Sequence, residues 1–376
     1  MKSSDNHTDL FSTFSPATKE AWAKAASAEI EGKNPFESLL WHQHGVTGLP
    51  FYDKSDSATA GFILPSSNEE FLGARGWYNM PLIKVLEEER ANNKALQYLT
   101  RGADGILFDL EKKNELSLKK LLNSIEWPFC KVSFLIHENV ESFFAQLQDY
   151  LQEKNYNPTT IEGFCHLKTY PHHPQSLHKV VHSFNSFTKL RLIGITSNLK
   201  DPAEQLSDLL AKAVTEVEKL TQAEINEEEA LRQVFFSVPV GHDFFLEIAK
   251  LKVLRMLWHQ VVKAYSVTNY TPSDVYIHAM TTVWSNEIFQ PHENMLAGTV
   301  SGLASVAGGC TSLTLEPAAE EERLERIALN VSHILREESH INKVADPTAG
   351  SYYLENLIKN LANATWKSFI EKMKQA

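Results

Sequence analysis

Short apolar runs and longer amphipathic runs alternate along most of this chain, from about residue 71 to residue 338. The short runs are rich in β-branched residues and apolar on both faces, which predicts parallel strands covered by helices. We expect strands at 71–78, 105–110, 130–136, 161–167, 189–195, 232–239, 274–281 and 311–317. The longer runs have helical spacing, and we expect helices at 81–100, 117–125, 139–155, 175–184, 202–223, 242–258, 291–307 and 318–338.

Eight strand–helix units in this order predict an α/β fold, specifically a closed (β/α)8 TIM barrel. Neither GxGxxG nor GxxxxGK[ST] follows any of the expected strands, which argues against a dinucleotide-binding sheet. We expect residues 1–68 to form an N-terminal arm that clasps a partner, residues 69–340 the barrel, and residues 341–376 a C-terminal helical extension.

Composition narrows the class of protein without identifying it. The 376 residues are 43% hydrophobic and 22% charged, with a net charge of −11 and no basic stripe for nucleic acid. No apolar run approaches the ~20 residues that span a bilayer, and the first residues, MKSSDNHTDLFSTF, lack the apolar core of a signal peptide. Three dispersed cysteines, Cys130, Cys165 and Cys310, indicate a reducing compartment. We therefore predict a cytoplasmic protein that binds neither nucleic acid nor membranes.

A few polar residues could carry chemistry, each with an alternative structural role. The segment HLKTYPHHPQSLHKVVH includes His178 and His182, four apart on an expected helix, but no carboxylate lies near to orient a metal ligand. We therefore favour solvated histidines and expect no metal. Asp109 and Glu316 stand at strand ends, where each is either a general base or a structural acceptor. His278 either points into the barrel mouth or is a hydrogen-bonded core histidine.

Several long segments together resemble one enzyme family, the methylmalonyl-CoA mutases. They are DFFLEIAKLKVLRMLW (243–258), TTVWS (281–285), NMLAGTVSGLASVAGGCTSL (294–313) and VADPTAGSYYLENL (344–357). The arm, AWAKAASAEIEGKNPFESLLWHQHGVTGLPFYDKSD, is more similar to the small (beta) subunit of the heterodimeric bacterial enzyme than to its large subunit. The resemblance implies a TIM barrel that acts in interconverting methylmalonyl-CoA and succinyl-CoA through radicals from adenosylcobalamin. It also implies that the pantetheine arm of the substrate threads the barrel.

The chain departs from the pattern of the catalytic members in ways that remove chemistry. Those members carry a tyrosine–histidine pair just after the fifth strand, where this chain has Thr196, Ser197 and Asn198. A donor that would polarise the thioester carbonyl is therefore missing. Catalytic members hold cobalamin in a further domain through a DxHxxG motif, which this sequence lacks, so we expect the cobalamin-binding domain to be absent. The segment after the fourth strand is also short, reading KTYPHHPQ.

The seventh strand keeps the scaffold part of the family pattern and loses a polar group. His278 and Thr281 match HxxTxxWS, together with Trp284 and Ser285, but Met280 stands where a glutamine is expected. Methionine cannot donate a hydrogen bond. Arg75 belongs to an Arg-Gly-Trp tail that is all that remains of a substrate-binding segment ahead of the first strand. We expect no catalytic residue in this chain. The expected remnants of a degenerate pocket are Arg75, Thr196, Ser197, Asn198, His278, Met280 and Thr281.

These features predict a noncatalytic small subunit of a heterodimeric, adenosylcobalamin-dependent methylmalonyl-CoA mutase, or its barrel portion. Its partner would be the catalytic large subunit, and cobalamin would reach the complex through that partner or a missing domain. Two alternatives remain open. The chain is an active acyl-CoA mutase barrel whose cobalamin domain is a separate chain or was truncated, or it binds CoA thioesters without chemistry.

Overall fold

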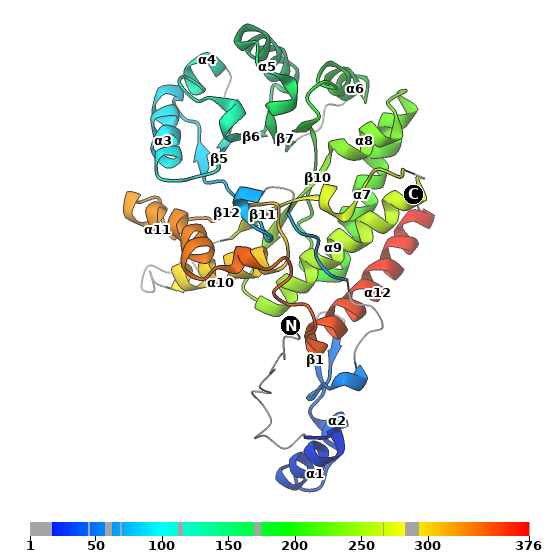
Figure 1. Cartoon of the computed structure of the whole chain (residues 1–376). Helices are drawn as coiled ribbons and strands as arrows, with labels where there is room; N and C mark the ends of the chain where they lie inside the picture. The colour runs from blue at the N-terminus through cyan, green and yellow to red at the C-terminus, as the bar shows by residue number, and fades with distance from the viewer. Residues whose placement is uncertain are drawn as a thin grey trace, which may run out of the picture.

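A ring of strands surrounded by helices forms the body of the molecule, and an N-terminal arm projects away from it (Figure 1). The computed structural model describes residues 17–43, 46–56, 62–67, 70–111, 116–168, 174–265, 267–282 and 293–375.

Two five-stranded parallel sheets make the barrel wall. Their strand orders are β3-β12-β11-β10-β9 and β4-β5-β6-β7-β8. The strands are β3 (Tyr78–Asn79), β4 (Leu82–Lys84), β5 (Gly105–Asp109), β6 (Lys131–Ile136), β7 (Glu162–Leu167), β8 (Lys189–Arg191), β9 (Ile193–Ile195), β10 (Val234–Val240), β11 (Tyr276–Thr281) and β12 (Ser312–Thr314).

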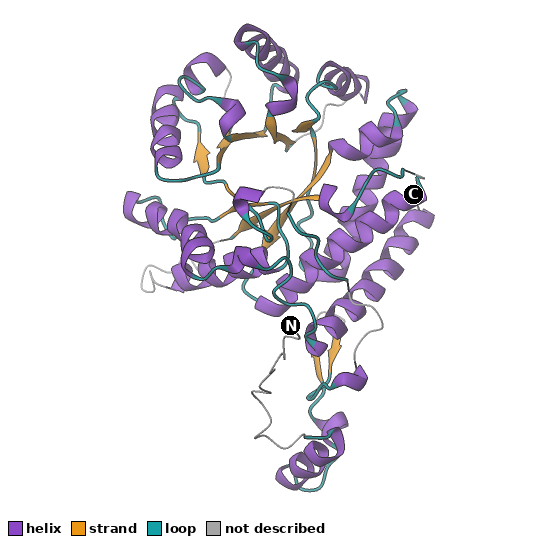
Figure 2. Cartoon of the chain, in the orientation of Figure 1, coloured by secondary structure: helices purple, strands orange, loops and turns teal. Residues whose placement is uncertain are grey.

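The chain itself joins the two sheets into one ring. Only Met80 and Pro81 separate β3 from β4, and only Leu192 separates β8 from β9, so each pair is one interrupted strand with a half in each sheet. Pro81 has no N–H to donate, yet its carbonyl accepts the N–H of Leu107, while Met80 donates to Leu313. Among the described residues, the wall therefore consists of eight strands, and they are arranged in a ring (Figure 2), which confirms the predicted (β/α)8 barrel.

Helices cover the outside of the ring. They are α3 (Glu88–Thr100), α4 (Leu118–Leu121), α5 (Val140–Lys154), α6 (Pro174–Ser183), α7 (Pro202–Gln222), α8 (Glu227–Gln233), α9 (Phe244–Ala264), α10 (Glu293–Ala307) and α11 (Glu322–His333), which continues as a π-helical turn at Ile334–Glu338. Short 3-10 turns lie at Glu70–Leu72, Trp127–Phe129, Pro158–Thr160, Pro272–Asp274 and Ile341–Lys343. Within the described residues, no helix combines the length and apolarity needed to cross a bilayer.

One large apolar core lies between the strands and these helices. Alternate strand residues face it, as Phe108 of β5 and Phe134 of β6 do, with ring centroids 5.9 Å apart. Helix α9 is buried on most of its surface because the C-terminal helix α12 (Tyr352–Gln375) lies along α7 and α9 (Figure 1).

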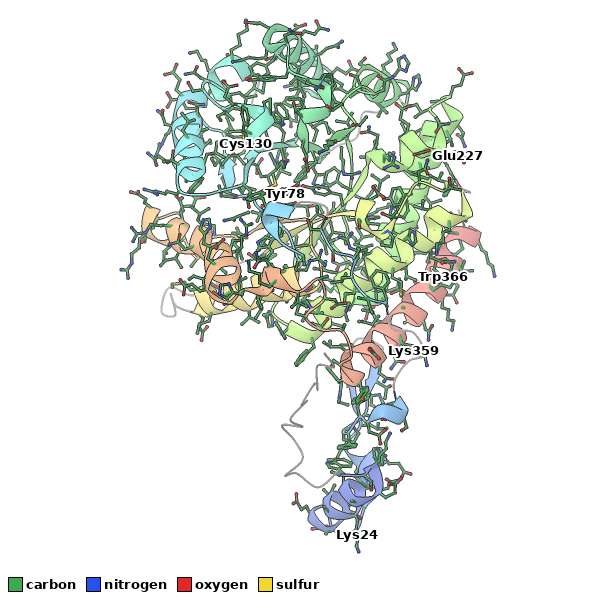
Figure 3. The ribbon with its side chains drawn as sticks, viewed as in Figure 1. Lys24, Tyr78, Cys130, Glu227, Lys359 and Trp366 are labelled. Atoms are coloured by element: carbon green, nitrogen blue, oxygen red, sulfur yellow. The ribbon has the colours of Figure 1, made fainter. Side chains whose placement is uncertain are left out.

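The arm consists of α1 (Lys19–Glu29), α2 (Pro35–Ser38), a hairpin of β1 (Trp41–Gln43) and β2 (Val46–Gly48), and a 3-10 turn at Lys54–Asp56. Its own contacts hold it together: the Lys19 ammonium lies 2.6 Å from the Asp56 carboxylate, and Trp22 stacks on Phe51. Helix α1 buries none of its residues, and Lys24 on it lies far from the ring of strands (Figure 3).

Some element boundaries were predicted wrongly. A helix starting at Pro81 is wrong, because Pro81 lies between two half-strands and α3 starts at Glu88. The expected strand 71–78 contributes only Tyr78, and the expected helix 117–125 is a single turn. Helix α8 was missed because its seven residues are too few to show periodicity.

Candidate functional site

Large side chains fill the interior of the barrel. Successive strand residues point to opposite sides, so Leu107, Leu135 and Phe164 face inward while their neighbours join the outer core. The inner cluster is separate from the outer one, and no member is more than 6% exposed. Its members are Leu72, Tyr78, Met80, Leu107, Leu135, Phe164, Phe235 and Tyr276.

Aromatic rings meet across the barrel axis. Phe164 of β7 lies 4.6 Å from Phe235 of β10 and 5.9 Å from Tyr276 of β11, measured between ring centroids. Strands β7 and β11 are not neighbours in the wall, so the second contact crosses the bore. Rings at these distances are in van der Waals contact. An extended ligand therefore has no path along the axis at this level.

A glycine makes room for these rings. A Cβ atom on Gly194 of β9 would lie 2.6 Å from Cζ of Phe235 and 2.7 Å from Cδ2 of His166. Both distances are far below normal contact. Gly194 thus leaves space on the inner side of the wall, and rings from other strands already occupy it.

Charged groups close the N-terminal end of the barrel. The Lys131 ammonium lies 2.8 Å from the Glu162 carboxylate and 4.7 Å from the ring centroid of Tyr78. Arg191 lies over the ring of Tyr276, at 5.2 Å. Cations over aromatic faces are attracted by the ring quadrupole. Figure 3 shows Tyr78 within the ring of strands.

Two buried histidines lie in the bore beside the rings. His166 and His278 are each 1% exposed, and burial lowers the pKa of each to about 3, helped by the charge of Lys168. Both are therefore neutral near pH 7. His278 Nδ1 lies 2.9 Å from the hydroxyl of Ser312. Within the described structure, neither nitrogen of His166 has a hydrogen-bond partner.

The C-terminal rim carries one acid–imidazole pair. His137 Nε2 lies 2.7 Å from the Asp109 carboxylate, and both side chains are partly exposed. Lys168 follows at the end of β7, where burial of its ammonium lowers its pKa. The structure thus pairs Asp109 with His137, which was not among the residues predicted from the sequence. His137 directly follows the expected strand 130–136, and this position could have indicated that it lies at the rim. Glu316 is exposed, and its backbone N–H donates to the Thr281 hydroxyl.

The loop after the fifth strand is fixed to helix α7. Lys212 donates to the carbonyl of Thr196, and the Gln205 amide donates to the carbonyl of Ser197. Ser197 is buried at 1%, Thr196 is half-buried, and Asn198 is exposed. None of these side chains is an acid, a base or a cation.

The remaining predicted site residues lie in two different places. His278, Met280 and Thr281 are together on β11, where alternation turns His278 and Met280 towards the bore and Thr281 away from it. Arg75 lies at the opposite, N-terminal end, where it donates to the carbonyl of Ala345 and is 6% exposed. The structure therefore does not bring Arg75 to the others.

Trp284 and Ser285 of the family pattern, and His172 and His173 of the histidine-rich segment, lie outside the described residues. The rings of His178 and His182 stack at 6.2 Å. No group of three or more metal-binding side chains occurs among the described residues.

Comparison with known sequences places the chain in a family. The family model described as methylmalonyl-CoA mutase matches residues 198–375. A methylmalonyl-CoA mutase small subunit from Streptomyces virginiae is 36% identical over 98% of this chain and 65% of its own length. The chain belongs to the methylmalonyl-CoA mutase family.

Other members of the methylmalonyl-CoA mutase family agree with this assignment. A small subunit from Porphyromonas gingivalis is 28% identical over 96% of this chain and 63% of its own length. The mitochondrial enzyme of Bos taurus is 25% identical over 92% of this chain and 54% of its own length. The chain therefore spans less than two thirds of the length of these relatives.

The two histidines in the bore do not fit adenosylcobalamin, the cofactor that the family implies. An imidazole that ligates cobalt must reach it with a free nitrogen, whereas His166 and His278 are buried among rings inside the bore. We assign no step to the cofactor in this chain, and the absence of a bound cofactor stays a prediction.

Proposed function

We propose that this chain is a noncatalytic subunit of an adenosylcobalamin-dependent methylmalonyl-CoA mutase and acts through a catalytic large subunit. The observation that carries the proposal is the filled bore. A substrate that threads a barrel needs a continuous path along the axis, and Phe164, Phe235 and Tyr276 meet across it. The similarity to small subunits supports the same reading.

The chemistry of the rim supports the proposal independently. A thioester isomerase stabilises charge on the acyl carbonyl with preorganised donors. In the fifth-strand loop, Thr196, Ser197 and Asn198 offer only hydroxyl and amide side chains, and Met280 offers no donor on the seventh strand. Among the described residues, no nucleophilic side chain is hydrogen-bonded to the Asp109–His137 pair.

The arm supplies a feature suited to a partner. Its helix α1 packs only against other parts of the arm among the contacts described above, has no fully buried residue, and lies away from the barrel. A stable obligate interface buries more than ~2,000 Å², and an extended arm adds such area at little cost to the barrel. We propose that the arm and neighbouring barrel helices contact the large subunit.

Reconstitution tests this function. The chain and the large subunit of a mutase from the same source are purified separately, mixed, and separated by size-exclusion chromatography with mutase assays on each fraction. We expect a 1:1 complex that is more active or more soluble than the large subunit alone, and no activity from this chain alone. Separate elution with unchanged large-subunit activity contradicts the proposal.

A truncated variant locates the interface. Deleting residues 1–40 removes α1 and α2 but leaves the barrel, the hairpin and α12 in place. We expect the truncated chain to fold, shown by an unchanged thermal transition, and to bind the large subunit at least about tenfold more weakly. Undiminished binding excludes the arm as the main contact.

A further inference from the structure

A cavity lies outside the barrel, beneath the β1–β2 hairpin. It has a volume of about 120 Å³ and is bounded by the hairpin, the start of α9 and the start of α12. Three apolar side chains contribute to its lining: Val46, Leu246 and Leu357. Each of them is at most 8% exposed, so the side chains on this side of the cavity are shielded from solvent.

Two aromatic rings form another part of the lining. Trp41 and Tyr353 both line the cavity, and their ring centroids are 6.4 Å apart at an interplanar angle of 47°. Tyr353 is held from behind by edge contacts with Tyr52 at 5.6 Å and Phe245 at 5.3 Å. The tyrosine is thus fixed in place before any ligand arrives, which lowers the entropic cost of binding.

The position of Trp41 depends on a glycine in the hairpin. A Cβ atom on Gly48 would lie 1.9 Å from the indole ring, so the indole lies directly on the backbone of β2. Any larger residue at this position displaces the ring. The hairpin therefore holds a tryptophan at the cavity in one defined place.

A carboxylate completes the lining. Asp243 lines the cavity and is also the N-cap of α9, accepting the N–H of Leu246 at 3.4 Å. Burial raises the pKa of Tyr353, and the charge of Asp243 raises it further, so the carboxylate and the phenol interact. The cavity therefore has a carboxylate and two aromatic rings in its lining.

We infer that this cavity binds a cationic group, an alkylammonium or a guanidinium. Aromatic faces attract a cation within about 6 Å of their centroids, most strongly for tryptophan, and a carboxylate adds a charge contact. The volume suits a head group of a few heavy atoms. A cation of this kind is either a free quaternary ammonium compound or an arginine or lysine side chain from another protein. This site does not depend on the proposed mutase function.

Fluorine NMR tests the inference on the full chain. The seven tryptophans are labelled as 5-fluorotryptophan, and the Trp41 resonance is assigned with Trp41→Phe. Choline is titrated against its neutral isostere, 3,3-dimethylbutan-1-ol. We expect a saturable shift of the Trp41 resonance with choline, at an affinity about fivefold higher than for the isostere. Equal affinities, or no saturable shift with any cation, overturn the inference.

Matched variants separate charge from folding. Asp243→Asn keeps a capping side chain but removes the charge, and we expect about tenfold weaker choline binding. Asp201→Asn makes the same change at the N-cap of α7, where Asp201 accepts the N–H of Glu204 at 3.0 Å, and should leave binding unchanged. Gly48→Ala should abolish binding by displacing Trp41. Equal effects of the two aspartate variants contradict a cation site.

A second titration identifies the source of the cation. N-acetylarginine amide is compared with N-acetylcitrulline amide, which has the same shape without the charge. Tighter binding of the arginine compound than of choline indicates a side chain from a partner protein, and the reverse order indicates a free quaternary ammonium. A citrulline compound that binds as well as the arginine compound counts against the inference.

Discussion

The two ends of the barrel differ in how they use charged side chains. At the N-terminal end, Arg336 contacts Asp104 at 2.8 Å, and Arg255 donates to the carbonyls of Val275 and Gly309 at 2.7 Å each. At the C-terminal end, the imidazoles of His166 and His278 are neutral and lie among aromatic rings.

This difference bears on whether each end of the barrel serves catalysis or stability. In TIM-barrel enzymes the C-terminal end carries the chemistry and the N-terminal end carries stability. Here the buried guanidinium groups of the N-terminal end are held by a carboxylate and by backbone carbonyls. Among the described residues of the C-terminal end, the bore is filled by rings and neutral imidazoles, below a rim that carries Asp109, His137 and Lys168. The comparison therefore favours a barrel that is kept as a scaffold.

The largest expected effect comes from removing a ring in the bore. Phe164→Ala deletes a fully buried ring that contacts Phe235, Tyr276 and His278. We expect the free energy of unfolding to fall by about 4 kcal/mol, since cavity-forming Phe→Ala changes cost about 3–5 kcal/mol. Urea denaturation measures this. A loss below about 1.5 kcal/mol would mean that the bore is not tightly packed.

The next effect concerns the buried ion pair outside the wall. Lys252 and Asp346 are 2.8 Å apart with side chains 2% exposed, and Asp346 also accepts the N–H of Leu64. Lys252→Met leaves a buried carboxylate without its cation and should destabilise the protein by about 3 kcal/mol. Lys84→Met, which removes a cation paired with the exposed Glu320, is the matched control, and we expect a change below about 1 kcal/mol. Equal losses contradict this assignment.

A smaller effect is expected from filling the space left by a glycine. Gly194→Ala places a Cβ atom 2.6 Å from Phe235, and overpacking of this kind costs about 1–3 kcal/mol. We expect about 2 kcal/mol by urea denaturation, and Phe235→Leu in the same chain should recover part of it. A neutral or stabilising Gly194→Ala would show that the bore contains free space.

The last effect, about as large as the preceding one between pH 7 and pH 5, is the response to acid at the C-terminal end. His166 and His278 have folded pKa values of about 3, below the ordinary 6.5, so the unfolded chain binds more protons. The contribution of the two neutral histidines to the free energy of unfolding is complete above about pH 6.5. It is lost as the pH falls from there towards 3, at about 1.4 kcal/mol per pH unit for each histidine.

A histidine variant separates the loss of stability caused by protonation of His166 from that caused by other acid-sensitive groups. The difference in unfolding free energy between His166→Leu and wild type is measured at pH 7 and at pH 5. We expect the variant to lose less stability than wild type over this interval, by about 2 kcal/mol. Parallel pH profiles would show that His166 is protonated in the folded protein without cost.

The alternation of short apolar runs with longer amphipathic runs was enough to predict the barrel. Parallel strands covered by helices are apolar on both faces, so each short run was recognised as a strand. It could not predict the interrupted strands at Pro81 and Leu192, since these depend on which sheet each half joins. The family resemblance indicated lost chemistry at Thr196–Asn198 and Met280. It gave no sign of the filled bore, because Phe164, Phe235 and Tyr276 come from separate strands and meet only in three dimensions. The pairing of Asp109 with His137 was missed for the same reason.

Calorimetric titration of succinyl-CoA into the isolated chain tests the central claim most directly. We expect no saturable heat at concentrations up to about 1 mM, because the rings that cross the bore leave no path for the pantetheine arm. Micromolar binding that is abolished by a bulky substitution at an inward-facing position near the C-terminal rim, such as Met280→Trp, would show that the bore admits the substrate and is not filled.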